Sequence, residues 1–138
     1  MDTADEIVGF EEPSSEVARL AHRVLGACIE VNRQLGPGYP ESVYHAALQV
    51  ELALRGISFQ PELTFALTYK GHLVGQGRVD LLVADVLIVE IKSCDELAPI
   101  HTAQVISYLK ATNKQLALLI NFNVRRLKDG VKRIANTR

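Results

Sequence analysis

The chain has 138 residues, of which 48% are hydrophobic, and its formal net charge is −1 at pH 7. This length and apolar content are sufficient for one hydrophobic core and too small for two large domains. No apolar run is long enough to cross a bilayer, and the acidic first residues lack the basic start of a secretory signal, so we expect a cytoplasmic protein without a membrane anchor.

Charge is distributed unevenly along the chain. Residues 1–16 contain six acidic residues and no basic residue, which leaves the rest of the chain with a net charge of +5. Six Lys and Arg residues, against one Asp, lie between Arg125 and the end of the chain. Such a cluster can neutralise phosphates, although solvated basic tails are common. The charge pattern therefore gives limited support for a nucleic-acid partner.

The first half of the chain predicts a leader and two helices. Residues 1–13 are acidic and show no periodicity, so we expect a flexible leader followed by a single domain over residues 14–138. A helix is expected to begin at Ser14 or Ser15, either of which can cap it, and to end near Gly36. Residues 36–40 predict a rigid turn, and a second helix follows from Pro40 to Gly56.

The second half of the chain predicts strands around one helix. Residues 63–69 alternate in polarity, residues 70–72 form a turn, and strand-like segments follow over residues 78–83 and 87–92. Helical spacing returns over residues 102–111. An apolar strand over residues 115–122 and a short terminal helix then complete the predicted order.

Two neighbouring strand-like segments carry charges inside apolar runs, where an isolated charge is expensive to bury. Glu90 and Lys92 share one face of their strand, and a hairpin that turns around Asp85 places Asp80 opposite Glu90. The two carboxylates would repel each other, and a hard divalent cation would relieve that repulsion. The pattern predicts a metal-dependent site that cleaves phosphodiester bonds. A surface ion pair on an edge strand remains the alternative.

A second group of polar residues lies on the predicted helix after this hairpin. Gln104 and Tyr108 are four residues apart and therefore share one helix face, where they can reach the same place. An exposed Gln and a half-buried Tyr with no role in a site would explain them equally well. His101, one turn before Gln104, is a candidate for a place near the substrate. The cysteines and histidines show no metal-ligand spacing.

Five short motifs occur in an order that resembles a known family. Residues 36–44 fit the signature of the GxxExxY proteins, and Asp80 followed by Glu90-Ile91-Lys92 is similar to the motifs of the PD-(D/E)xK nuclease superfamily. The Gln104 and Tyr108 pair resembles an element of the RecB-like branch, and residues 121–123 and 128–133 resemble the closing segment. The resemblance implies an α/β fold with a restriction-endonuclease-like core, in which helices flank a central mixed sheet.

The resemblance also implies roles for individual residues. Asp80 and Glu90 would bind Mg²⁺ or Mn²⁺ with help from the Ile91 carbonyl, and Lys92 would orient or activate the attacking water. Glu41 matches a helix-borne acid that can add a metal ligand, although the helix dipole also favours an acid there. The expected substrate contacts are Gln104, Tyr108, Tyr44 and His101. Val79 stands before Asp80 where the superfamily often has proline, a substitution that the superfamily tolerates.

The function expected from these observations is Mg²⁺-dependent hydrolysis of a nucleic acid, with DNA a better candidate than RNA. A catalytically inactive nucleic-acid-binding or regulatory protein with the same fold is the main alternative. A pure protein-interaction module would leave the acids and the lysine unexplained. A domain of this size has little room for a specificity module, so selectivity would come from a homodimer or a separate partner.

Overall fold

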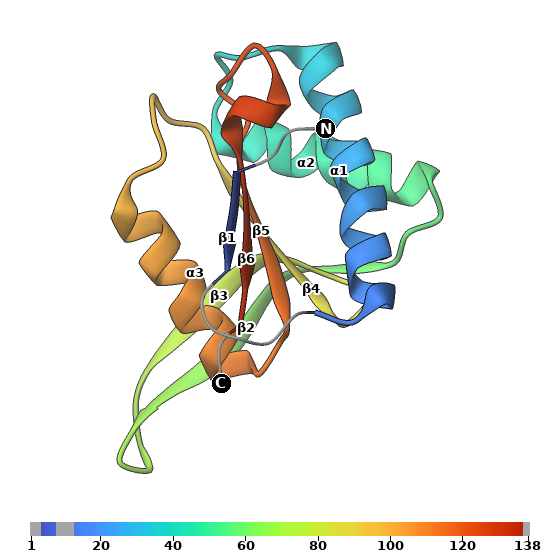
Figure 1. The fold of residues 1–138 in the computed structure, drawn as a ribbon. Helices are drawn as coiled ribbons and strands as arrows, with labels where there is room; N and C mark the ends of the chain where they lie inside the picture. The colour runs from blue at the N-terminus through green and yellow to red at the C-terminus, as the bar shows by residue number, and fades with distance from the viewer. Residues whose placement is uncertain (1–3, 8–12, 137–138) are drawn as a thin grey trace.

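The computed structural model describes residues 4–7 and 13–136. A six-stranded sheet separates two helical layers (Figure 1): helices α1 (Ser15–Leu35) and α2 (Glu41–Leu54) cover one face, and helix α3 (Pro99–Thr112) covers the other. The strands are β1 (Ala4–Ile7), β2 (Phe59–Tyr69), β3 (His72–Val83), β4 (Leu87–Lys92), β5 (Leu116–Asn121) and β6 (Val131–Ala135). A short 3₁₀ helix, η1 (Leu127–Gly130), precedes β6.

The sheet is mixed, with strand order β1-β6-β5-β4-β3-β2. Strands β4 and β5 are parallel and are connected through α3, and β1 is parallel to β6. The remaining neighbours are antiparallel. This arrangement confirms the predicted α/β class with a central mixed sheet flanked by helices.

Helix α1 begins and ends where the sequence predicts. The Ser14 hydroxyl accepts a hydrogen bond from the Val17 N–H at 3.3 Å. At the other end Gly36 has a φ of 69°, and its N–H donates to the Asn32 carbonyl at 2.7 Å. Only glycine adopts this left-handed conformation without steric cost, which explains the sharp stop.

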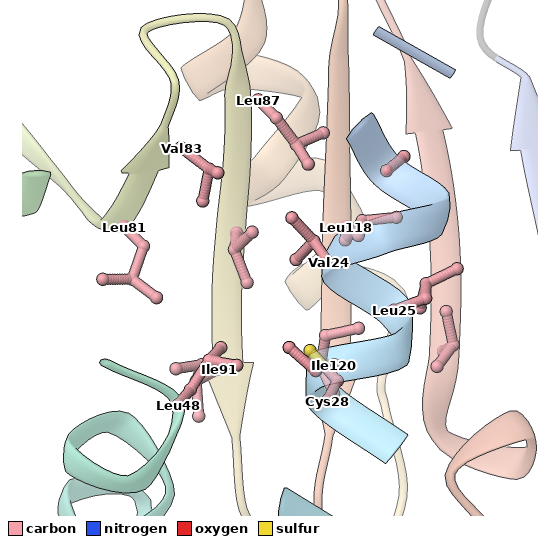
Figure 2. Packing of buried hydrophobic residues seen from close by; sticks show 14 of the residues in the cluster. Val24, Leu25, Cys28, Leu48, Leu81, Val83, Leu87, Ile91, Leu118 and Ile120 are labelled. Atoms are coloured by element: carbon pink, nitrogen blue, oxygen red, sulfur yellow. The ribbon is translucent and has the colours of Figure 1, made fainter. Parts of the chain in front are cut away.

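The core lies on both faces of the sheet. Figure 2 shows the larger cluster, in which side chains of α1 and α2 pack against β3, β4 and β5. Cys28 is fully buried there, and burial raises the pKa of its thiol to about 12, so it behaves as the core residue that its helical spacing predicts. A smaller cluster lies beneath α3 and includes Val105, Leu109, Ile88 and Leu119.

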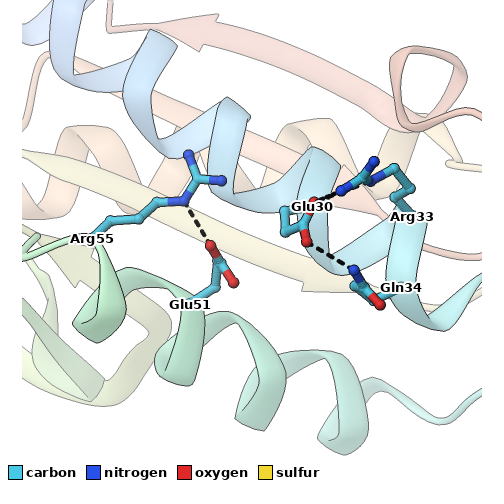
Figure 3. A network of polar contacts seen from close by, with 5 residues as sticks. All are labelled: Glu30, Arg33, Gln34, Glu51 and Arg55. Carbon is cyan, nitrogen blue, oxygen red and sulfur yellow. Dashed lines mark hydrogen bonds and ion pairs between the residues drawn. The ribbon is translucent and has the colours of Figure 1, made fainter.

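Salt bridges on the outer surfaces of α1 and α2 are local. Glu30 contacts Arg33 at 2.7 Å and Gln34 at 2.9 Å, and Glu51 contacts Arg55 at 2.7 Å (Figure 3). Exposed pairs of this spacing contribute only about 0.3–0.5 kcal/mol each. The position of the two helices over the sheet therefore depends on the buried cluster.

Two tight turns set the register of the three consecutive strands β2, β3 and β4. Ala84 and Asp85 both have positive φ, and the Val86 N–H donates to the Val83 carbonyl at 3.0 Å, which is the geometry of a type I′ turn. Lys70 and Gly71 also have positive φ and connect β2 to β3. The tip of the β2–β3 hairpin projects beyond the rest of the fold (Figure 1).

Both ends of the chain differ from the sequence-based expectation. Within the expected leader, Ala4–Ile7 form β1 beside β6, while residues 1–3 and 8–12 lie outside the described residues. The basic end of the chain is not a simple tail with a terminal helix. After η1 it forms β6, and its Val131, Ile134 and Ala135 are buried. Pairing with a strand on each side explains why so basic a segment is ordered as sheet.

Candidate active site

Asp80 and Glu90 meet where β3 and β4 separate. Regular pairing of the two strands ends at Leu81 and Val89, the residues adjacent to Asp80 and Glu90. There the Asp80 N–H donates to Glu90 Oε1 at 2.8 Å, and the Ile91 N–H donates to Asp80 Oδ2 at 2.7 Å. The carboxylates thus take the place of ladder carbonyls as acceptors. The predicted position of Asp80 opposite Glu90 is confirmed.

Glu90 is buried, with 4% of its surface exposed. Among residues whose side chains the structure describes, no other Asp, Glu, Lys or Arg is buried to this degree. Burial, and then the negative charge of Asp80, raise the pKa of Glu90 to about 8. The hydrogen bond from the Asp80 N–H and the charge of Lys92 act in the opposite direction. Burial and the neighbouring carboxylate therefore disfavour the bare negative charge of Glu90, which a bound proton or cation would stabilise.

Lys92 is the last residue of β4 and is half-buried. It is paired with Asn121 of β5, and its carbonyl accepts a hydrogen bond from the Phe122 N–H at 3.0 Å. This pairing fixes the backbone at the end of the strand. Because its ammonium charge lowers the pKa of Glu90, Lys92 belongs to the same electrostatic site.

Glu41 lies in the first turn of α2, near enough for its charge to act on Glu90 but not gathered with Asp80 and Glu90 into a three-acid group within the described residues. Its side chain is exposed, and its negative charge makes the smallest of the contributions that raise the pKa of Glu90. The turn that places it is held from two sides: the Gly38 N–H donates to Asn123 Oδ1 at 3.0 Å, and the Ser93 hydroxyl donates to the Tyr39 carbonyl. Two loops that are distant in sequence, at Ser93 and Asn123, thus fix the start of α2.

Tyr44 does not occupy a substrate-binding position, contrary to the sequence-based expectation. Its side chain is fully buried, and its ring stacks on Phe122 with centroids 4.9 Å apart. Its hydroxyl donates to the Gly36 carbonyl at 2.6 Å and accepts from the Tyr39 N–H at 3.2 Å. These contacts leave no surface for a substrate, so Tyr44 serves to hold the turn before α2.

Gln104 and Tyr108 share one face of α3, as their spacing predicts, and Gln104 is near enough to Tyr108 to lower the pKa of its hydroxyl. Partial burial, and then the charge of Glu90, raise the pKa of Tyr108, whereas Arg78 lowers it. The Tyr108 ring packs edge-on against Phe65 of β2, with centroids 5.0 Å apart. The pair is therefore within the electrostatic reach of the acidic site and is supported by the hairpin.

His101 lies at the start of α3. Its ring Nδ1 accepts a hydrogen bond from the Ala98 N–H at 3.0 Å, and the main-chain N–H of His101 donates to the Ala98 carbonyl at 3.0 Å. Because the first N–H groups of a helix lack intrahelical partners, this contact explains His101 as a helix-capping residue. Its half-buried ring is held at the end of α3 that precedes Gln104.

The structure adds residues that the sequence reasoning missed. His45 of α2 contacts the Asp80 carbonyl at 3.1 Å, and the positive charge of Arg78 lowers the pKa of Tyr108. Asn121, which is buried, accepts from the Cys94 N–H at 3.1 Å and donates to the Cys94 carbonyl at 2.9 Å. A signal for His45 was available, because it follows Glu41 by four residues and therefore shares its helix face.

The donor atoms at the site suit a hard divalent cation. One oxygen of each carboxylate accepts a backbone N–H, and within the described part of the chain the other oxygen forms no hydrogen bond. No group of three or more His, Cys, Asp or Glu side chains in the described ranges gathers as a metal site. Mg²⁺ commonly keeps several waters and uses only one or two carboxylates, so the pair fits this cation.

Comparison with known proteins shows the family of the chain. A family model described as the PD-(D/E)XK nuclease superfamily matches residues 18–134. The chain belongs to the PD-(D/E)XK nuclease superfamily. No curated protein gives a significant match.

One solved structure, described as the crystal structure of SSO0001, is similar, with a TM-score of 0.55 and 19% sequence identity. The match covers 70% of this chain and 50% of that chain, so this chain spans half of its length. At this identity the similarity supports the fold alone. Across residues 4–7 and 13–136, no helix is both long and apolar enough to span a membrane.

Proposed function

We propose that the protein is a Mg²⁺- or Mn²⁺-dependent nuclease that hydrolyses phosphodiester bonds in DNA. The observation that carries this proposal is the Asp80 and Glu90 pair, which lies at the parting of two central strands with one oxygen of each carboxylate available to a ligand. Membership of the superfamily supports nuclease chemistry on a nucleic acid. Within the superfamily we assign the chain to the GxxExxY proteins of the RecB-like branch.

In this proposal Asp80 and Glu90 hold the cation together with the Ile91 carbonyl. Glu41, which does not gather with the two acids among the described residues, would join as a further ligand only with the cation bound. A bound divalent cation would polarise a phosphoryl oxygen and lower the pKa of a coordinated water. The high pKa of Glu90 in the metal-free protein is consistent with this role, because a cation would supply the missing positive charge.

Lys92 and residues of α3 would act on the attacking water and on the substrate. The Lys92 ammonium lies in the field of Glu90 and would orient the attacking water or offset charge that develops on the phosphoryl oxygens. Gln104 and Tyr108 would contact the substrate, and His101 would hold the start of their helix. Tyr44 is buried and is not proposed to contact the substrate.

The partners follow from the charge and size of the chain. Outside the acidic first 16 residues the net charge is +5, which favours a polyanion. We propose DNA over RNA, a cytoplasmic location, and a homodimer or separate partner as the source of selectivity. The second candidate, a nucleic-acid binder without turnover, is favoured by the lack of a third His, Cys, Asp or Glu gathered with the Asp80 and Glu90 pair in the described part of the chain.

A cleavage assay separates the two candidates. Linear, circular and single-stranded DNA, and RNA, would each be incubated with the pure protein in Mg²⁺, in Mn²⁺ and in chelator. We expect cleavage of DNA with either metal and none in chelator. Lys92→Ala should lower the rate about 10²-fold or more while the protein stays folded. The exposed Lys110 on α3 provides the control, since Lys110→Ala should cleave normally.

Two results would contradict the proposal. Binding of DNA without cleavage in any metal would select the inactive alternative. Unchanged turnover by Lys92→Ala would remove this lysine from the mechanism.

A further inference from the structure

A histidine of α2 is hydrogen-bonded to the main chain of Asp80. His45 Nε2 lies 3.1 Å from the Asp80 carbonyl oxygen, and Gln49 Nε2 lies 2.9 Å from His45 Nδ1. A carbonyl oxygen can only accept, so Nε2 of the imidazole must carry the hydrogen. Nδ1 of a neutral ring is then an acceptor, and the Gln49 amide supplies its donor. The two contacts therefore fix one tautomer and one orientation of the ring.

Asp80 needs such a partner because of its place in the sheet. Pairing between β3 and β4 ends at Leu81 and Val89, so the main chain of Asp80 has no regular ladder partner on β4. Its N–H instead donates to Glu90 Oε1, and its carbonyl accepts from His45 Nε2. Its carboxylate is held by the Ile91 N–H. Each polar group of Asp80 thus has a separate anchor.

The side-chain pattern of β3 changes at the same place. Leu81 and Val83 belong to the cluster beneath α1 and α2, whereas Val79 belongs to the cluster beneath α3. Simple alternation would put all three on one face. The strand therefore departs from a regular pleat at Asp80, where an anchor from outside the sheet has the most effect on the direction of the carboxylate.

We propose that His45, held by Gln49, is a positioning residue that fixes the Asp80 peptide and so directs the Asp80 carboxylate toward the cation. This inference rests on the proposed function, since the carboxylate matters because it binds metal. Glu41, His45 and Gln49 follow one another at intervals of four residues on α2. One face of this helix therefore carries both the additional acid and the anchor for Asp80.

Substitutions at His45 can separate its hydrogen bond from its bulk. His45→Ala removes the donor, whereas His45→Gln keeps an amide donor at a similar reach. Loss of a group that orients a metal ligand typically costs 10–100-fold in metal affinity. We expect His45→Ala to weaken Mn²⁺ binding by about tenfold in calorimetry of the protein without nucleic acid, and His45→Gln to recover most of this loss. Gln49→Ala should have a smaller effect of the same sign.

Catalysis should change in a way that a general loss of stability would not produce. For His45→Ala we expect kcat to fall with little change in KM for DNA, because the imidazole contacts Asp80 and not the substrate. His22 on α1 is exposed and provides the matched control. His22→Ala should leave metal affinity and kcat unchanged.

A third readout does not depend on metal or cleavage. The Ile91 N–H is hydrogen-bonded to the Asp80 carboxylate, so its hydrogen exchange reports how well that carboxylate is held. In metal-free His45→Ala this amide should exchange faster, while the Leu118 amide in the core of β5 should not. If wild type neither binds Mn²⁺ nor cleaves DNA but Ile91 behaves this way, the proposed function fails, and only the hold of His45 on the Asp80 carboxylate remains.

Three results would overturn the inference. Unchanged Ile91 exchange in His45→Ala would show that the imidazole does not hold Asp80. If His45→Ala bound Mn²⁺ as tightly as wild type does, the position of Asp80 would not depend on His45. Equal losses in His45→Gln and His45→Ala would assign the effect to the shape of the ring and not to its hydrogen bond.

Discussion

At the scale of single residues, the hydroxyl of Tyr44 connects the turn before α2 to the core. Tyr44→Phe keeps the ring stacked on Phe122 but removes both hydrogen bonds of the hydroxyl, to Gly36 and Tyr39. Because the Gly36 carbonyl loses its donor in a partly buried place, we expect a loss of about 1–2 kcal/mol in the free energy of unfolding. Urea denaturation measures this loss.

Tyr69 supplies the control for this prediction, since it is 63% exposed at the tip of the β2–β3 hairpin. Tyr69→Phe should change the unfolding free energy by less than about 0.5 kcal/mol. Equal midpoints for Tyr44→Phe and wild type would show that the hydroxyl contributes nothing to the fold.

The pKa of Glu90 predicts how stability depends on pH. The carboxyl titrates near its ordinary value of 4.5 in the unfolded chain and at about 8 in the folded, metal-free protein. Between these values the folded state binds one more proton than the unfolded state, so stability falls as pH rises through this window. One such proton corresponds to a slope of about 1.4 kcal/mol per pH unit.

Glu90→Gln tests this dependence because glutamine keeps an acceptor for the Asp80 N–H and cannot ionise. Urea denaturation in chelator, from pH 5 to pH 8, should show that wild type loses stability relative to the variant as pH rises. Parallel curves for the two proteins would contradict the raised pKa.

At the scale of elements, the β2–β3 hairpin supports Tyr108 through a glycine. Gly77 pairs with Phe65, and a Cβ atom at Gly77 would lie 2.2 Å from the Phe65 ring. The same ring packs edge-on against Tyr108. We therefore expect Gly77→Ala to displace Phe65 and disturb Tyr108, with about 1–3 kcal/mol of destabilisation.

Gly75 on the same strand provides the control, because a Cβ there would meet only Leu67 Cδ1 at 4.0 Å among the nearby atoms of the described chain. Thermal unfolding and the KM for DNA would be measured for both variants. Gly77→Ala should lower the melting temperature and raise KM, while Gly75→Ala should do neither. Similar results for the two variants would disprove the support of Tyr108 by Phe65.

The elements also show what the sequence could and could not predict. Helix α1 was predictable because a capping serine, helical apolar spacing and Gly36 all agree. The turn at Ala84 and Asp85 set the register of β3 and β4, which was enough to bring the two acids together. Strand β6 was missed because its buried positions do not alternate regularly and basic residues lie between them.

At the scale of the whole molecule, the site depends on contacts between elements that are distant in sequence. Asp80 and Glu90 could be paired from one hairpin, but the contact of His45 with Asp80 requires α2 to pack on the sheet in one particular position. The burial of Tyr44 likewise follows from its stacking on Phe122, 78 positions later in the chain. Periodicity gives no information on such distances, which explains why these two residues were assigned wrongly or overlooked.

The proposed activity depends on a cation held between Asp80 and Glu90. Calorimetric titration of the nucleic-acid-free protein with Mn²⁺ tests this most directly, with Asp80→Asn as the variant and Asp129→Asn, an exposed site on η1, as the control. Asparagine can still accept the Ile91 N–H, so the fold should be retained. We predict binding by wild type and by Asp129→Asn, and affinity at least about tenfold weaker for Asp80→Asn. Equal affinity of all three proteins, or no binding by wild type, would contradict a cation site between Asp80 and Glu90.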